Sequence, residues 1–113
     1  MMTIGDIHWV DIPDTGGREQ AGRRPAIVIQ NDEFARSLPT VLLIPLSSAI
    51  AALRFPGTAQ IKANKTSGLK TDSVALVFQL RAMDRGRLKD KVGVVSESEM
   101  ADIRSELAKL LGS

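Results

Sequence analysis

The side chains best suited to chemistry in this chain lie in the segment Thr15–Pro25. Its eleven residues include three arginines, one glutamate and one glutamine, together with three glycines. Glycine lets the backbone adopt turns that other residues resist, so we expect the segment to form a loop between two strands. Arginine presents a planar fork of donors that fits two oxygens of a phosphate. The pattern therefore predicts a cationic loop that holds a polyanion.

Further polar side chains follow or lie on predicted strands. Ser47 and Ser48 come directly after an apolar run, and a serine pair in that place is most often ordinary turn chemistry. Gln79 and Arg81 alternate with apolar residues and are expected on one face of a strand. His8 is the only histidine, which excludes an acid–base pair of two histidines. On the residues alone, each of these groups is as well explained by a structural role.

The elements that must position these groups are mainly strands. Alternating or continuously apolar segments bounded by glycine, proline and polar residues are typical of strands. They predict strands at Gly5–Ile12, Ala26–Asn31, Thr40–Leu46, Thr58–Lys62, Ser73–Ala82 and Val92–Val95. The first is expected to be half-buried, with Ile7 and Trp9 on one face, and Thr40–Leu46 is expected to be buried on both. Segment 49–57 is expected to be a connection that carries Arg54.

The C-terminal segment predicts one amphipathic helix. Ser96 and Glu99 have the spacing of a capping box, and Gly112 stands where a helix is expected to stop. Apolar residues recur at helical spacing along one face, at Met100, Ile103, Leu107 and Leu110. Several short strands followed by one packed helix predict a mainly β fold, a small barrel or strongly bent sheet closed at one side by a helix.

Composition limits the class of protein. The 113 residues are expected to form a single domain, 1–113, with 43% hydrophobic and 25% charged residues. There is no cysteine and no apolar run near the roughly 20 residues needed to cross a bilayer, and the N-terminus lacks the pattern of a signal peptide. We therefore expect a cytoplasmic protein. The net charge of +2 permits a phosphate-backbone partner without requiring one.

Several of these segments resemble the MazF/PemK (Kid) toxin family. The similarity runs from Gly5 to the terminal helix, and its most specific part is the core Glu-Gln-Ala-Gly-Arg-Arg-Pro at 19–25. This core lies within the matching segment Gly17–Asn31, and the other matching segments are Gly5–Asp11, Pro45–Ser48, Asp72–Gln79, and Asp84 with Arg87–Leu88. The resemblance implies an SH3-like barrel of the CcdB/PemK type that forms a homodimer. It also implies a ribosome-independent and metal-independent endoribonuclease that needs no cofactor.

The same resemblance implies the partners and the site. Members of the family cut single-stranded RNA at short sequences, and the C-terminal segment of a cognate MazE-like antitoxin covers the RNA groove. Arg24 resembles the catalytic arginine, Ser47 falls where many members have a catalytic threonine, and Glu19 occupies a position implicated in activity. The residues expected to bind RNA are Arg18, Gln20, Arg23, Ser48, Arg54, Gln79 and Arg81. The Kid-type arginine and aspartate before the glutamine are replaced by Leu76 and Phe78.

Metal-free cleavage of RNA requires the 2′-hydroxyl to attack its neighbouring phosphate, which leaves a 2′,3′-cyclic phosphate and a 5′-hydroxyl. The charge that develops on the phosphate must be stabilised, and protons must leave the nucleophile and reach the leaving oxygen. We assign charge stabilisation to Arg24, a hydrogen bond to the same phosphate to Ser47, and the role of base to Glu19. Lys62, Lys65 and Lys70 are either guides for the RNA backbone or an ordinary solvated face.

Two other functions fit parts of the sequence. A CcdB-like inhibitor of DNA gyrase has a related fold, but this helix ends Lys-Leu-Leu-Gly-Ser, without the terminal Trp-Gly-Ile of CcdB proteins. An SH3-like peptide-binding module needs a groove lined with aromatic residues, and only 4% of this chain is aromatic. With one tryptophan and no tyrosine, the sequence does not indicate an extended platform for stacking bases, and Trp9 is expected in the core or an interface.

Overall fold

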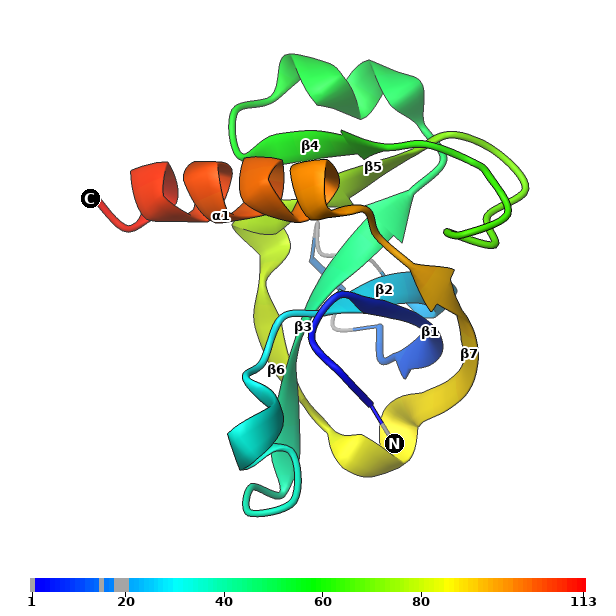
Figure 1. The fold of residues 1–113 in the computed structure, drawn as a ribbon, viewed down its shortest axis with the longest axis vertical. Coiled ribbons are helices and arrows are strands. Elements are labelled where there is room, and N and C mark those ends of the chain that lie inside the picture. The colour runs from blue at the N-terminus through cyan, green and yellow to red at the C-terminus, as the bar shows by residue number, and fades with distance from the viewer. Residues whose placement is uncertain (1, 15, 18–20) are drawn as a thin grey trace.

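A bent antiparallel sheet with one helix across its end forms the fold in the computed structural model, which describes residues 2–14, 16–17 and 21–113 (Figure 1). The strands are β1 (Asp6–Ile12), β2 (Gly22–Val28), β3 (Thr40–Ser47), β4 (Thr58–Ile61), β5 (Ser73–Leu76), β6 (Arg81–Asp84) and β7 (Leu88–Val94), and the helix is α1 (Glu97–Leu110). Short 3₁₀ helices occupy four connections: η1 (Asp32–Phe34), η2 (Ile50–Arg54), η3 (Val77–Gln79) and η4 (Arg85–Arg87).

The strand β3 joins the two halves of the sheet. The strand order is β4-β5-β3-β2-β1-β7, and β6 also pairs with β3. The first half of β3 pairs with β6 from Thr40 to Leu43, whereas its end pairs with β5 at Leu46 and Ser47. The strand β3 therefore pairs with different strands at its two ends, and the sheet is strongly bent (Figure 1). The predicted mainly β fold with a C-terminal helix is confirmed, and the sheet is bent without being closed.

Buried apolar residues form two clusters, one on each side of the central strands. The helix-side cluster includes Ile7, Ile27, Ile44, Leu46, Ile61 and Ile103. The second cluster includes Val10, Ile12, Ala26, Val28, Val41, Leu43 and Met83. Because β1, β2 and β3 contribute to both clusters, these strands are buried on both faces. This confirms the prediction for β3 and corrects the prediction of a half-buried β1, in which Val10 is fully buried and Trp9 is 39% exposed.

The helix α1 begins and ends as the sequence predicts. The Ser96 hydroxyl accepts a hydrogen bond from the Glu99 N–H, and the Glu99 carboxylate accepts one from the Ser96 N–H, which completes the capping box. Met100 and Ile103 are buried against the sheet. The second Glu99 oxygen accepts from the Lys62 N–H at 2.8 Å, so this one side chain also ties the helix to the end of β4.

Two strand predictions near the site are wrong in an informative way. Residues 73–82 are not one strand, because β5 pairs with the end of β3 and β6 with its beginning, and the chain turns through η3 between them. The second strand starts at Gly22 rather than Ala26, because the pairing of β1 with β2 continues out to Ile12 opposite Gly22. Arg23 and Arg24 are therefore on a strand of the sheet rather than in a loop.

The connection between β4 and β5, residues 62–72, lies tightly against β7. The Val94 N–H donates to the Thr66 carbonyl. A Cβ on Gly68 would lie 2.1 Å from the Val92 carbonyl oxygen, and a Cβ on Gly93 would lie 2.2 Å from the Ser67 carbonyl oxygen, so both glycines are required by this contact. In the described ranges, no helix has the length and apolar character needed to span a membrane.

Candidate functional site

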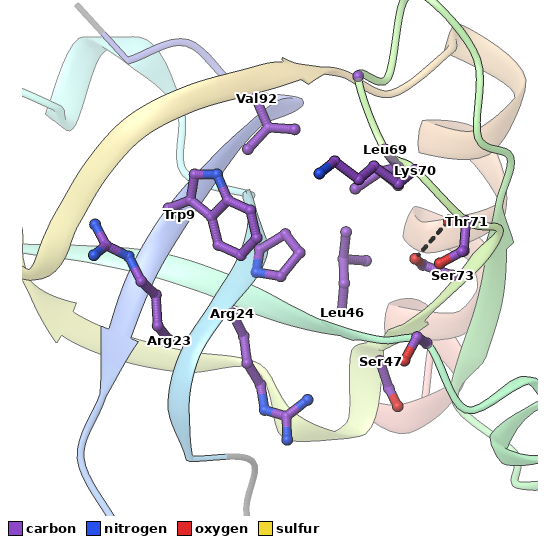
Figure 2. A pocket seen from close by; sticks show the side chains of 13 residues that line it. Trp9, Arg23, Arg24, Leu46, Ser47, Leu69, Lys70, Thr71, Ser73 and Val92 are labelled. Atoms are coloured by element: carbon purple, nitrogen blue, oxygen red, sulfur yellow. Dashed lines mark hydrogen bonds between the residues drawn. The ribbon is translucent and has the colours of Figure 1, made fainter.

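A cleft of about 600 Å³ opens between the exposed end of the β1–β2 hairpin and the connection 62–72 (Figure 2). Its apolar lining comes from Trp9, Pro25, Leu46, Leu69 and Val92, and its cations are Arg23, Arg24 and Lys70. The remaining lining residues are Ser47, Ser48, Gly68, Thr71 and Ser73. Among the described residues, three cations and no acidic side chain line this cleft, so this part of the chain attracts anions.

Arg24 reaches the cleft from β2 and is fixed by the hairpin. Its Nε donates to the Ala21 carbonyl oxygen at 2.9 Å, and Arg24 itself is partly buried. Within the described ranges this is the one hydrogen bond of its side chain. The two terminal nitrogens therefore remain for a ligand, and two parallel donors match two oxygens of a phosphate.

Ser47 reaches the same cleft from the last position of β3. Its side chain is buried, with 7% of the residue exposed. Its Oγ accepts a hydrogen bond from the Ala49 N–H at 3.1 Å, a turn that fixes the hydroxyl at the end of the strand. A hydroxyl that accepts one bond still has its own proton to donate. Arg24 and Ser47 can thus donate into one shared cleft, as Figure 2 shows.

The other predicted residues of the arginine-rich segment divide into two groups. Arg23 lines the cleft beside Arg24, and its Nε lies 3.9 Å from an Asp11 carboxylate oxygen in an exposed ion pair. Arg18, Glu19 and Gln20 lie outside the described residues. Ser48 lines the cleft next to Ser47 and is exposed.

The remaining predicted RNA-binding residues do not line this cleft. Gln79 lines a second, apolar hollow of about 670 Å³ that meets the cleft at Ser47. Arg54 is exposed and lies over the ring of Phe55, 5.2 Å from its centroid. Arg81 begins β6, where one of its terminal nitrogens is buried without a hydrogen-bond partner among the described atoms. The predicted grouping of Gln79 and Arg81 on one strand face is wrong, since Gln79 ends η3.

The cleft also contains Trp9, for which the sequence predicts no site role, and Lys70, for which the sequence leaves a guide for the RNA backbone and a solvated face open. Trp9 was expected in the core or an interface, yet it belongs to neither buried cluster and forms part of the cleft lining. Lys70 lines the cleft, whereas Lys62 and Lys65 from the same connection do not. The strand period did place Trp9 on the face opposite His8 and Val10, but it could not show what covers that face.

His8 takes a structural place at the edge between β1 and β7. Its Nδ1 lies 2.9 Å from the Lys89 carbonyl oxygen, and its Nε2 lies 3.8 Å from the buried Asp6 carboxylate. The Asp6 carboxylate also accepts a hydrogen bond from the Thr3 N–H and forms an ion pair with the Lys91 ammonium. His8 does not line the cleft. In the described part of the chain, no three His, Asp or Glu side chains lie close enough together to hold a metal ion.

The fold and the cleft together define a class of protein: a small bent β sheet with a C-terminal helix and a cationic cleft that has arginine and hydroxyl donors. Residues 3–111 match the family model described as PemK-like, MazF-like toxin of type II toxin-antitoxin system. The chain belongs to this family.

Individual relatives agree with the family assignment. The chain is 36% identical over 112 residues to an Endoribonuclease MazF of Staphylococcus epidermidis, covering 99% of this chain and 92% of the relative. The crystal structure of MazF from Deinococcus radiodurans is similar with a TM-score of 0.84 and 26% identity, covering 99% of this chain and 97% of that one. A MazE-MazF structure from the same organism has a TM-score of 0.74 and 25% identity, covering 98% and 96%.

Proposed function

We propose that this protein is the toxin of a type II toxin-antitoxin module and acts as an endoribonuclease on single-stranded RNA, including mRNA. The observation that carries the proposal is the shared cleft of Arg24 and Ser47 at the ends of β2 and β3. The name and 36% identity of the staphylococcal relative support it. Messenger RNA is cytoplasmic, and a chain without cysteine is suited to that compartment.

The proposed chemistry uses no metal and no cofactor. The 2′-hydroxyl attacks the adjacent phosphorus, the bond to the 5′-oxygen breaks, and the products carry a 2′,3′-cyclic phosphate and a 5′-hydroxyl. The terminal nitrogens of Arg24 bind the oxygens on which negative charge develops, and the Ser47 hydroxyl donates to the same group. Glu19 is proposed to accept the proton of the nucleophile, and the departing 5′-oxygen takes a proton from solvent water, so that proton loss and gain balance. Arginine keeps its proton throughout the physiological pH range and therefore serves charge stabilisation better than proton transfer.

The alternative, a CcdB-like inhibitor of DNA gyrase, makes the opposite prediction in a simple experiment. The purified protein is incubated in EDTA with a long single-stranded RNA of diverse sequence, and in parallel with gyrase and relaxed plasmid. We expect discrete RNA fragments and normal supercoiling. Intact RNA together with blocked supercoiling would support the inhibitor and reject the nuclease.

A MazE-like antitoxin is the proposed protein partner, and its C-terminal segment is proposed to occupy the RNA groove. The MazE-MazF structure from Deinococcus radiodurans supports this pairing. A cleft to which the described residues contribute three cations and no carboxylate suits an acidic segment as well as RNA. Addition of the cognate antitoxin is expected to stop RNA cleavage at a one-to-one ratio of chains or below.

The proposed active form is a homodimer, and the apolar hollow beside the cleft is the surface proposed to bind the second copy. The hollow includes Phe55, Phe78 and Leu110, all of them more than 40% exposed, and the two phenylalanine rings meet edge to face with centroids 6.2 Å apart. Exposed apolar surface of this kind marks an interaction site. Phe78→Glu is expected to convert a dimer to a monomer in sedimentation, and Phe34→Glu, an exposed residue outside the hollow, is the matched control.

A further inference from the structure

We infer that Trp9 and Lys70 form a nucleotide subsite in the cleft, in which the indole stacks on a base of the bound RNA and the ammonium binds a neighbouring phosphate. The inference rests on the proposed function and extends it to a wall of the cleft away from Arg24 and Ser47. Its first support is the position of Trp9. This side chain is 39% exposed, although the strand that carries it contributes Ile7 and Val10 to the two buried clusters.

Two neighbouring side chains hold the indole in place. Trp9 pairs with Pro25 across the β1–β2 ladder, and Pro25 and Val92 line the cleft beside it. Figure 2 shows the indole beside Val92. Proline and the β-branched valine have few rotamers, so they hold the indole with little freedom to move. A base that stacks on a ring already held in place loses less free energy to ordering of the protein.

The connection that carries Lys70 is also held firmly. Ser67 is 1% exposed, its Oγ donates to the Lys62 carbonyl oxygen at 2.8 Å, and its N–H donates to the Asn64 side chain at 2.8 Å. The Asp72 carboxylate accepts from the Ala63 N–H and so joins the two ends of the connection. The close approach of Gly68 to β7 fixes the whole segment against the sheet. Lys70 is thus presented to the cleft by a rigid support.

The charged and aromatic side chains of the cleft indicate which kind of ligand it binds. Lys70 is exposed and, within the described ranges, makes no ion pair or side-chain hydrogen bond. The cleft combines this free ammonium and two arginines with an aromatic face, and none of its lining residues in the described ranges is acidic. Phosphate alone would not use an indole, whereas single-stranded nucleic acid offers both a phosphate and a base to stack. The chemistry therefore favours a nucleotide of the RNA chain over a free anion.

Fluorescence of Trp9 tests the inference directly, because this is the only tryptophan and the chain has no tyrosine. The probe is a 2′-O-methyl RNA of the cleaved sequence, which lacks the attacking hydroxyl and so binds without reaction. We expect saturable quenching at the concentrations that inhibit cleavage. Unchanged fluorescence at a concentration that inhibits cleavage fully overturns the inference. Quenching by an antitoxin peptide but not by the RNA probe would assign this wall to the protein partner and equally overturn it.

Kinetics of variants provide the second test. Trp9→Ala is expected to raise KM by roughly 5- to 150-fold, the range for loss of one stacked base, with kcat nearly unchanged. Trp9→Phe keeps a ring and is expected to keep most of the affinity. Lys70→Gln is expected to lower the slope of log affinity against log salt by about 0.7, while the matched control Lys65→Gln, from the same connection but outside the cleft, leaves it unchanged.

The outcomes separate the inference from the function on which it rests. If the wild-type protein cuts no RNA, the proposed function itself fails. If it cuts RNA and both Trp9→Ala and Lys70→Gln keep the wild-type KM and salt slope, only the subsite is rejected. Thermal unfolding of each variant confirms that it is folded, and the fluorescence measurement needs no variant at all.

Discussion

The sharpest quantitative prediction concerns the hydroxyl of Ser47. In the structure its Oγ accepts the Ala49 N–H and keeps its own proton for a ligand in the cleft. Ser47→Ala removes both interactions while leaving the backbone of β3 intact. A hydrogen bond to a charged group is worth about 1.5–3 kcal/mol, which corresponds to roughly 10- to 150-fold in rate if the bond is made in the transition state. We expect kcat to fall by that factor.

The expected loss of stability in Ser47→Ala is smaller than the loss of activity and can be measured separately from it. Loss of the bond from Ala49 removes about 1 kcal/mol, which lowers the melting temperature by about 5 °C in a domain of this size. The assay is single-turnover cleavage of a labelled RNA at saturating protein, well below the melting temperature of both proteins. Ser48→Ala is the matched control, because Ser48 lines the same cleft but is exposed. Its kcat is expected to stay within about threefold of wild type.

Ser47→Thr separates the hydroxyl from other features of the side chain. Threonine keeps the hydroxyl and adds a methyl group that restricts χ1. It is expected to recover most of the activity that Ser47→Ala loses. A folded Ser47→Ala protein with a kcat within threefold of wild type would refute the role of this hydroxyl.

Two further predictions concern the helix α1. Glu99→Ala breaks the capping box with Ser96 and leaves the Lys62 N–H without its acceptor, so we expect a loss of about 1–3 kcal/mol in chemical denaturation, while Glu99→Gln, which keeps an acceptor oxygen, loses less. The side-chain hydrogen bond from Lys109 lowers the pKa of Glu106 from its ordinary value of 4.5. The ionised Glu106 carboxylate therefore stabilises the fold above about pH 4.5, and this stabilisation is lost as the pH falls through the pKa of the folded protein. Below pH 4.5 the melting temperature of Glu106→Gln is expected to decline less than that of the wild-type protein.

Local signals are sufficient to predict the helix. A capping box and an apolar stripe are set by neighbours within one or two turns, so Ser96, Glu99, Met100 and Ile103 lie where the spacing predicts. Local signals are not sufficient to predict which residues meet in the cleft. The sequence placed Arg24 and Ser47 together only through the resemblance to a family, since their proximity depends on the pairing of β2 with β3, which is not a local property.

The wrong predictions share one physical cause, which is that long-range pairing determines where strands end. Residues 73–82 are apolar enough for one strand, but β3 already binds β5 and β6 at different places, so the chain must turn at η3. The same pairing draws Gly22, Arg23 and Arg24 into β2. Local propensity is overridden in both cases by partner strands.

Trp9 illustrates what periodicity cannot reveal. Alternation assigns it to a face, but exposure depends on whether another element covers that face. Here the connection 62–72 approaches β7 closely through Gly68 and Gly93, and this leaves a cleft in front of the indole. Nothing in the sequence near Trp9 encodes that distant contact.

The most direct test of the central claim is to map both ends of the RNA fragments that the wild-type and Arg24→Ala proteins produce in EDTA. The wild-type protein is expected to give breaks at one recurring short sequence, with 2′,3′-cyclic phosphate and 5′-hydroxyl ends. Arg24→Ala is expected to remain folded and to cut at least about 100-fold more slowly, the effect of losing one donor to a developing oxyanion. Cleavage by Arg24→Ala at the wild-type rate, or fragments with 3′-hydroxyl and 5′-phosphate ends, would contradict the account.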